Sequence, residues 1–385
     1  MKHEQPRLAR RSLHALGLAL CVRLMALSPA APADPGPAEG AGGEAVAASH
    51  PSIAPAERAA AEATPTADPT TEPPLPSGQR PAAPLEPRRK QGVPTLGGMQ
   101  LWTDLVVFHG WRIQRHAVTG HCRLLDEQDR RWESGSFSQC RATLDAQRQA
   151  LAMPPLDKRV VILTHGLFGT RLFLHEMERY LAERGEFEVL TWGYASTRGD
   201  IDEHAEALAG MIEALEGVEE ISFVAHSMGG LVVRRYLAMG PSGTLPDARI
   251  RRLVMLGTPN QGAARARLWA SDGVVGEVFG LVAGRAAEQL SSDWEATAAR
   301  LAVPPCEFGI LAGGRGDGMG RHQGIPGDDD GMVGVDETRL DGAAEHLVLP
   351  VTHRGLLRDP RAMECTLRFL QRGSFVEPAA KDDGP

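Results

Sequence analysis

Residues 221–237 read ISFVAHSMGGLVVRRYL, an apolar run followed by a helical pattern, with a serine at the junction. The run Ile221–Ala225 is typical of a buried parallel strand, and the residues after the serine are apolar at helical spacing. Ser227 is therefore expected in a sharp strand-to-helix turn, a nucleophile elbow, which needs small neighbours such as Ala225 and Gly229. Ala225 stands where this turn usually has glycine. A serine that caps a helix is the alternative explanation.

Strand-like and helix-like segments alternate on both sides of this turn. Apolar runs predict further strands at Val160–Leu163, Phe187–Trp192, Ile250–Leu256, Cys306–Leu311 and Leu347–Val351. Apolar residues at helical spacing predict helices at Arg171–Arg184, Asp202–Leu215 and Met228–Met239. The sequence therefore predicts an α/β fold whose mostly parallel central sheet has helices on both faces. In such sheets, functional residues gather in the loops beyond the carboxyl ends of the strands.

A smaller β-rich segment precedes the alternation. We expect short strands at Thr103–Phe108, Trp111–Arg115 and His121–Leu125, followed by a helix at Phe137–Leu151. The folded domain is expected to span residues 98–376, with residues 98–158 as an N-terminal β/helix extension whose role the sequence leaves open.

The two ends of the chain have different compositions from the domain. Residues 1–33 combine a basic start, a short apolar run and small residues around position 32, which predicts an export signal and a periplasmic, cell-envelope or secreted protein. A disordered basic tail on a cytoplasmic protein is the alternative. Residues 34–97 are rich in Pro and Ala and predict a disordered linker, and residues 377–385 form a tail.

The composition excludes several classes of protein. The 385 residues carry a formal net charge of −8, which argues against a nucleic-acid-binding protein. No run of about 18 apolar residues exists, so a protein with several membrane spans is excluded. Four cysteines remain if the signal is removed: Cys122, Cys140, Cys306 and Cys365. They permit disulfides, and buried free thiols explain them equally well, so no pairing is assigned.

The loop after the strand at Val160–Leu163 reads THGLFGT, residues 164–170. A glycine bend here can direct a backbone N–H at an oxyanion, and Leu167 is the candidate donor. The N–H of Met228, directly after the serine, is the second candidate. An ordinary strand-to-helix turn is the alternative reading of this loop.

A histidine follows the last predicted strand. His353 comes directly after Leu347–Val351, at the edge of the sheet where the serine turn is expected. The other candidates are less well placed, because His346 precedes its strand, His204 lies on a helix and His322 lies in a Gly-rich loop. His226 neighbours the serine, but the strained turn should direct it elsewhere. His353 is therefore the candidate base.

An acid that orients this histidine is expected in the long Gly-rich loop after Cys306–Leu311. The candidates are Asp328, Asp329, Asp330, Asp336 and Glu337. Gly331 favours Asp330, because it allows a sharp bend that brings a carboxylate under the histidine, whereas Asp328 and Asp329 are expected to be solvated. The resulting order of serine, acid and histidine is the one expected of this fold. Clustered aspartates could also bind a cation, but the spacing does not match an EF-hand loop.

Together these motifs resemble the α/β-hydrolase superfamily, in particular its bacterial lipase and serine-esterase branch. The matching segments are residues 164–169, 225–230, 256–262 and 330–333 and the His353 loop. The resemblance implies Ser227 as nucleophile, Asp330 as orienting acid and His353 as base, with Leu167 and Met228 as oxyanion donors. It implies no metal or organic cofactor.

The same resemblance implies an enzyme that hydrolyses carboxylic esters of small molecules or lipids, with contact to a membrane surface as a further expectation. Thioesterase, amidase and acyltransferase activities use the same residues and stay open, as does a non-catalytic binding protein on this fold. Residues 264–300 lie where this fold often inserts a lid, and their apolar residues fit either a mobile lid or a core helix.

Overall fold

The computed structural model describes residues 98–241, 244–271 and 283–377 of the chain. The predicted export signal, the linker and all but the first residue of the predicted tail lie outside the described residues. In the part of the chain that is described, no helix is long and apolar enough to cross a membrane.

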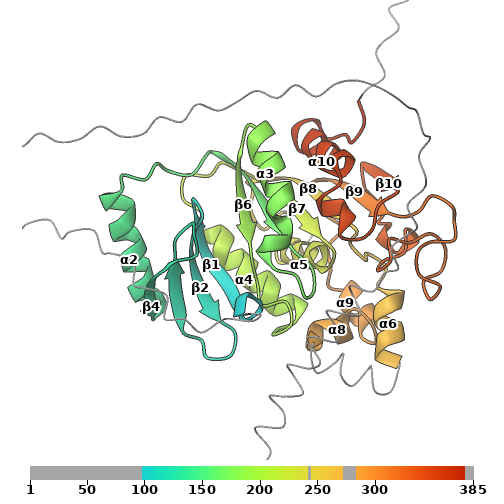
Figure 1. Ribbon diagram of the computed structural model, residues 1–385, viewed down its shortest axis with the longest axis horizontal. Helices are drawn as coiled ribbons and strands as arrows, with labels where there is room; N and C mark the ends of the chain where they lie inside the picture. The colour runs from blue at the N-terminus through green and yellow to red at the C-terminus, as the bar shows by residue number, and fades with distance from the viewer. Residues whose placement is uncertain (1–97, 242–243, 272–282, 378–385) are drawn as a thin grey trace, which may run out of the picture. The chain divides into compact units, whose positions relative to one another are not determined.

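The main sheet has six strands, all parallel, in the order β10-β9-β8-β7-β5-β6 (Figure 1). Its strands are β5 (Arg159–Thr164), β6 (Glu188–Trp192), β7 (Glu220–His226), β8 (Ile250–Leu256), β9 (Glu307–Gly313) and β10 (Glu345–Leu349). Each predicted strand of the alternating region is present, and the predicted mostly parallel sheet is confirmed. His346 lies near the amino end of β10, not before the strand as the sequence suggested.

Helices cover both faces of this sheet, because successive side chains of each strand point to opposite faces. Val160 and Ile162 of β5 pack with α4 (Ile201–Glu213) and α5 (Met228–Leu237). Val161 and Leu163 pack on the other face with α3 (His175–Arg184) and α10 (Pro360–Arg372). The single helix predicted at Arg171–Arg184 is divided into the 3₁₀ turn η2 (Arg171–Leu174) and α3.

The N-terminal extension forms a separate antiparallel sheet, β1-β2-β3-β4. Its elements are η1 (Gly98–Leu101), β1 (Trp102–Phe108), β2 (Trp111–His116), β3 (Cys122–Leu125), β4 (Arg131–Gly135) and α2 (Phe137–Ala150). β1 lies beside β6 of the main sheet (Figure 1). The sequence analysis missed β4, because Trp132 is its single large apolar residue and the strand forms by pairing with β3.

The remaining elements lie in the loops that follow β8, β9 and β10. They are α6 (Ala264–Ser271), α8 (Arg285–Gln289), α9 (Trp294–Ala298), η3 (Asp336–Thr338) and η4 (Gly355–Leu357). Most of the apolar set predicted for the lid falls in residues 272–282, outside the described residues. Cys122, Cys140, Cys306 and Cys365 are all free thiols, so none of the disulfides that the sequence permitted is formed among them.

Candidate active site

Ser227 lies between β7 and α5 with backbone angles φ 56° and ψ −130°, a region that side-chain-bearing residues rarely adopt. Its N–H donates to the carbonyl of Leu256 on the neighbouring strand β8 (2.9 Å). Two glycines allow the turn to be this tight. A Cβ on Gly229 would lie 2.7 Å from the carbonyl oxygen of His165, and one on Gly230 would collide with Thr258. The predicted sharp turn is thus present, and its serine is half-buried.

The loop after β5 lies directly against this serine. A Cβ on Gly166 would be 2.6 Å from Ser227 Cβ and 2.9 Å from its Oγ, so only glycine allows this approach. Among the described residues, the backbone N–H groups of Leu167 and Met228 donate hydrogen bonds to no partner. Met228 is also the first residue of α5, where the helix dipole favours negative charge. The two N–H groups are thus available to a ligand oxygen.

Asp330 and His353 form a buried pair in the loops after β9 and β10. His353 Nδ1 lies 2.7 Å from Asp330 Oδ2, and the His353 N–H donates to the Asp330 carbonyl (2.9 Å). The other carboxylate oxygen accepts from the N–H groups of Met332 (2.9 Å) and Val333 (2.8 Å). The bend at Gly331, with φ 95°, closes this short loop. The carboxylate is therefore fixed with one oxygen directed at the imidazole.

His353 and Ser227 lie at the same edge of the sheet and share neighbours. His226 Nε2 donates to the His353 carbonyl (3.0 Å), and the two imidazole rings are 4.6 Å apart. A Cβ on Gly257 would lie 3.0 Å from His353 Nδ1. No hydrogen bond joins Ser227 Oγ to His353 within the described ranges, and in ligand-free sites such bonds often tighten only when substrate is bound. The sequence analysis missed the contact between His226 and His353.

Three features lie at the carboxyl edge of one parallel sheet: a strained serine turn after β7, an acid after β9 and a histidine after β10. Their order along the chain is serine, aspartate, histidine. The chain has the α/β-hydrolase fold.

Two other acids that the sequence offered as partners of His353, Asp328 and Asp329, hold the Gly-rich loop of this α/β-hydrolase fold together. Asp329 is fully buried and accepts from the N–H groups of Arg321 (2.7 Å), His322 (3.0 Å) and Gly331 (2.6 Å). Asp328 accepts from the N–H groups of Arg315 (2.7 Å) and Gly316 (2.8 Å). The expectation of a solvated carboxylate is therefore wrong for Asp329, whereas Asp328 is half-buried.

The last two candidate acids have partners other than the histidine. Asp336 is exposed and pairs with Arg339. Glu337 accepts from the N–H of Gly334 (2.9 Å) and from the N–H of Ala264 (2.5 Å), where α6 begins. Within the described ranges, no cluster of three or more His, Cys, Asp or Glu residues could hold a metal ion.

Three other histidines of this fold are buried near the site. Burial lowers the pKa of His165 and of His204 to about 4, and burial holds the pKa of His226 well below its usual range. All three rings are therefore neutral at pH 7.

This burial predicts a pH dependence of stability. In the unfolded chain each of these histidines takes up a proton near pH 6.5, whereas in the folded protein His165 and His204 resist protonation down to about pH 4 and the pKa of His226 is also well below its usual range. We expect the contribution of these histidines to the free energy of unfolding to be complete above pH 6.5 and to be lost as the pH falls. The loss at pH 5 should be about 2 kcal/mol for each of His165 and His204, with a further loss of the same sign from His226. Urea unfolding at pH 7.5 and pH 5 measures it.

The control for this prediction is His204→Asn, whose side chain does not titrate. The variant should lose the part of the pH dependence that His204 contributes and keep the part that His165 and His226 contribute. A free energy of unfolding that stays constant between pH 7.5 and pH 5 would contradict the buried neutral histidines.

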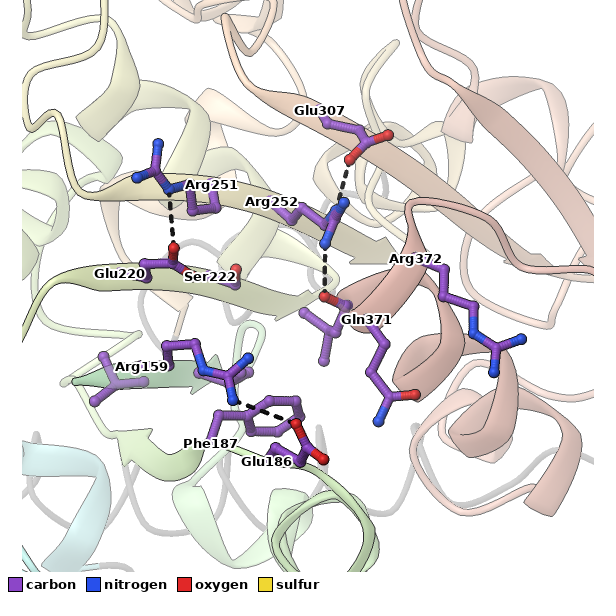
Figure 2. A pocket seen from close by; sticks show the side chains of 13 residues that line it. Arg159, Glu186, Phe187, Glu220, Ser222, Arg251, Arg252, Glu307, Gln371 and Arg372 are labelled. Atoms are coloured by element: carbon purple, nitrogen blue, oxygen red, sulfur yellow. Dashed lines mark hydrogen bonds and ion pairs between the residues drawn. The ribbon is translucent and has the colours of Figure 1, made fainter. Parts of the chain in front are cut away.

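A cavity of about 660 Å³ lies at the opposite edge of the sheet (Figure 2). Residues at the amino ends of β5, β7, β8 and β9 line it, so it is separated from Ser227 by the length of the strands. Several of its charged side chains pair with a residue of the neighbouring strand, as in Arg251 with Glu220 (3.6 Å) and Arg252 with Glu307 (2.5 Å). It contributes nothing to the site described here.

Residues 120–282 match a family model described as a domain of unknown function, DUF7379. No curated protein matches the chain.

Several solved structures are similar to the chain. A lipase of Bacillus licheniformis in mature form is 16% identical, with a TM-score of 0.44 over 57% of this chain and 94% of the lipase. A phospholipase of Legionella pneumophila is 18% identical, with a TM-score of 0.43 over 57% of this chain and 60% of the phospholipase. A metagenomic carboxyl esterase is 17% identical, with a TM-score of 0.38 over 52% of this chain and 66% of the esterase. The assignment of the fold rests on the strands and turns of this chain.

Proposed function

We propose that this protein is a serine hydrolase that cleaves carboxylic esters through an acyl-enzyme on Ser227. The observation that carries the proposal is the fixed Asp330–His353 pair at the sheet edge where Ser227 occupies its strained turn. A serine hydroxyl is a weak nucleophile at neutral pH and needs such a base close by. The Leu167 and Met228 N–H groups complete the set, because a tetrahedral intermediate carries an oxyanion that needs donors.

The proposed mechanism gives each proton a route. With Nδ1–H donating to Asp330 Oδ2, the His353 Nε2 carries the lone pair and accepts the proton of Ser227 Oγ. Oγ then bonds to the ester carbonyl carbon, whose oxygen becomes the oxyanion between Leu167 and Met228. Nε2–H passes the proton to the leaving alcohol as the carbon–oxygen bond breaks. Water repeats the sequence on the acyl-enzyme and releases the acid.

An apolar cluster beside the oxyanion loop supports an acyl substrate. Phe168 is buried against Ala283 and Ala287, and Leu167 and Trp269 pack on the same cluster. This cluster joins the loop to the segment after β8, which the sequence analysis interpreted as a lid or a core helix. Leu167 and Trp269 are the half-buried members of this cluster, and their apolar side chains suit the hydrocarbon part of a small-molecule or lipid ester.

A panel of p-nitrophenyl esters from acetate to palmitate tests the proposal. We expect hydrolysis of at least the short and medium chains, and labelling by a fluorophosphonate that mass spectrometry places on Ser227. A panel of thioesters, anilides and acyl acceptors run in parallel separates the thioesterase, amidase and acyltransferase alternatives. Absence of both turnover and labelling in the folded protein would contradict the proposal and favour a binding protein.

A further inference from the structure

The peptide unit that carries the Leu167 N–H is held by the side chain before it. His165 Nδ1 lies 2.9 Å from the carbonyl oxygen of Gly166, and the Gly169 N–H donates to the same oxygen (3.0 Å). The Gly166 carbonyl and the Leu167 N–H belong to one planar peptide unit and point in opposite directions. Fixing the direction of this carbonyl therefore fixes the direction of the N–H.

Tyr194 in turn holds His165. The Tyr194 hydroxyl donates to the His165 carbonyl (2.8 Å), and the two rings stack at 4.6 Å with 5° between their planes. The Tyr194 N–H donates to His165 Nε2 (3.4 Å). Because the buried ring is neutral, an acceptor role for Nε2 places its single proton on Nδ1, where it donates to Gly166.

The N-terminal sheet fixes the backbone on both sides of Tyr194. Asp104 on β1 exchanges two hydrogen bonds with Gly193, through its own N–H (2.9 Å) and through Oδ2 (2.7 Å). Thr103 Oγ1 accepts from the N–H of Ala195 (3.1 Å). Tyr194 therefore lies between two residues, Gly193 and Ala195, whose backbone forms hydrogen bonds with β1.

A buried ion pair secures β1 in this position. Asp104 is fully buried and accepts from Arg112 (2.8 Å) and Gln114 (2.7 Å) on β2. Arg112 also donates hydrogen bonds to the carbonyl of Thr191 near the end of β6 (2.9 Å) and to the Thr191 hydroxyl (3.1 Å). A buried ion pair adds little net stability compared with apolar packing, so its effect here is to set the geometry between the two sheets.

We propose that the N-terminal sheet β1–β4 orients the Leu167 N–H of the oxyanion site, through Thr103 and Asp104 and then through Tyr194 and His165. This inference rests on the proposed function, because it gives the extension a role in ester hydrolysis. Thr103, Asp104, Tyr194 and His165 are positioning residues, since they act through the loop rather than on the substrate.

The variant Thr103→Val tests the proposal with little change of shape. It removes the acceptor of the Ala195 N–H, so Tyr194 and the loop beyond it lose one fixed point. Misplacement of a catalytic group by about 1 Å costs on the order of a hundredfold in rate. We expect kcat for ester hydrolysis to fall about 10- to 100-fold while KM changes less than about twofold, as for an interaction made only in the transition state. Amide hydrogen exchange should become faster in residues 164–170.

Two control variants separate positioning from general weakening of the sheet. Thr103→Ser restores the hydroxyl and should restore kcat. Ile113→Val removes one methylene from the small core of the N-terminal sheet, a core to which Tyr194 does not belong. It should lower the melting temperature while leaving kcat and the exchange of residues 164–170 unchanged. If Thr103→Val does not fold, Tyr194→Phe, which removes only the bond to the His165 carbonyl, gives the same two readouts.

The outcomes distinguish this inference from the proposed function. Unchanged kcat and unchanged exchange in Thr103→Val would overturn the inference and leave the hydrolase intact. If the natural protein hydrolyses no ester, faster exchange in Thr103→Val but not in Ile113→Val would support the structural coupling while the proposed function fails. Equal effects in Thr103→Val and Ile113→Val would mean that both substitutions act only by weakening the protein in general. That result would overturn the inference.

Discussion

Ser227→Ala is expected to lower kcat for ester hydrolysis by at least about 10⁴-fold, because serine hydrolases lose most of their rate with the nucleophile. The substitution removes one oxygen from a half-buried side chain and keeps the same backbone strain. The fold should therefore be retained, with unchanged circular dichroism and a melting temperature within about 2 °C. Fluorophosphonate labelling should be lost in parallel.

Ser222→Ala provides the matched control for this experiment. Ser222 is also half-buried, but it lies on β7 near the end of the strand opposite to Ser227, beside the charged cavity. Its kcat and its labelling should equal those of the natural protein. Turnover that survives in Ser227→Ala with a native spectrum would assign the nucleophile to another residue.

Asp330→Asn is expected to lower kcat by several hundredfold or more, with little change in KM. The carboxylate accepts from His353 Nδ1–H, whereas an amide group can present its NH₂ there and stabilise the tautomer with the proton on Nε2. That tautomer has no lone pair for the Ser227 proton, and the corresponding change in a serine protease costs about 10⁴ in kcat. Steady-state kinetics across the ester panel measures the effect.

Asp336→Asn is the control, because this carboxylate is exposed and, in the part of the chain that the structure describes, pairs only with Arg339. It should change kcat by less than about tenfold. Asp329→Asn is less suitable as a control, since its carboxylate holds three backbone N–H groups and its loss weakens the whole Gly-rich loop. If Asp336→Asn lost its activity while Asp330→Asn kept it, the role of orienting acid would have to be assigned to a residue other than Asp330.

The sequence predicts the strands of the main sheet because buried parallel strands are continuous apolar runs, and the run Ile250–Leu256 coincides with β8. It also predicts which loops meet, since the carboxyl ends of parallel strands share one edge. It does not predict β4, whose residues are mostly polar and which forms by pairing with β3.

The supporting interactions escape sequence analysis for a different reason. The role of Asp329 depends on backbone N–H groups, which every residue other than proline carries, so its residue type gives no signal. The bonds from Arg112 to Thr191 span 79 residues of chain and exist only because the two sheets meet. A motif supplies the chemical type of a residue, but its partners are set by tertiary contacts.

The positive φ of Ser227 lowers the stability of the folded protein whether or not substrate is present. A side chain held in that region costs on the order of 1–3 kcal/mol, which glycine would avoid. Glycine at this position would therefore give a more durable molecule that has lost its reactive oxygen. Under the proposed function, Ser227 is therefore a site where stability is traded for activity.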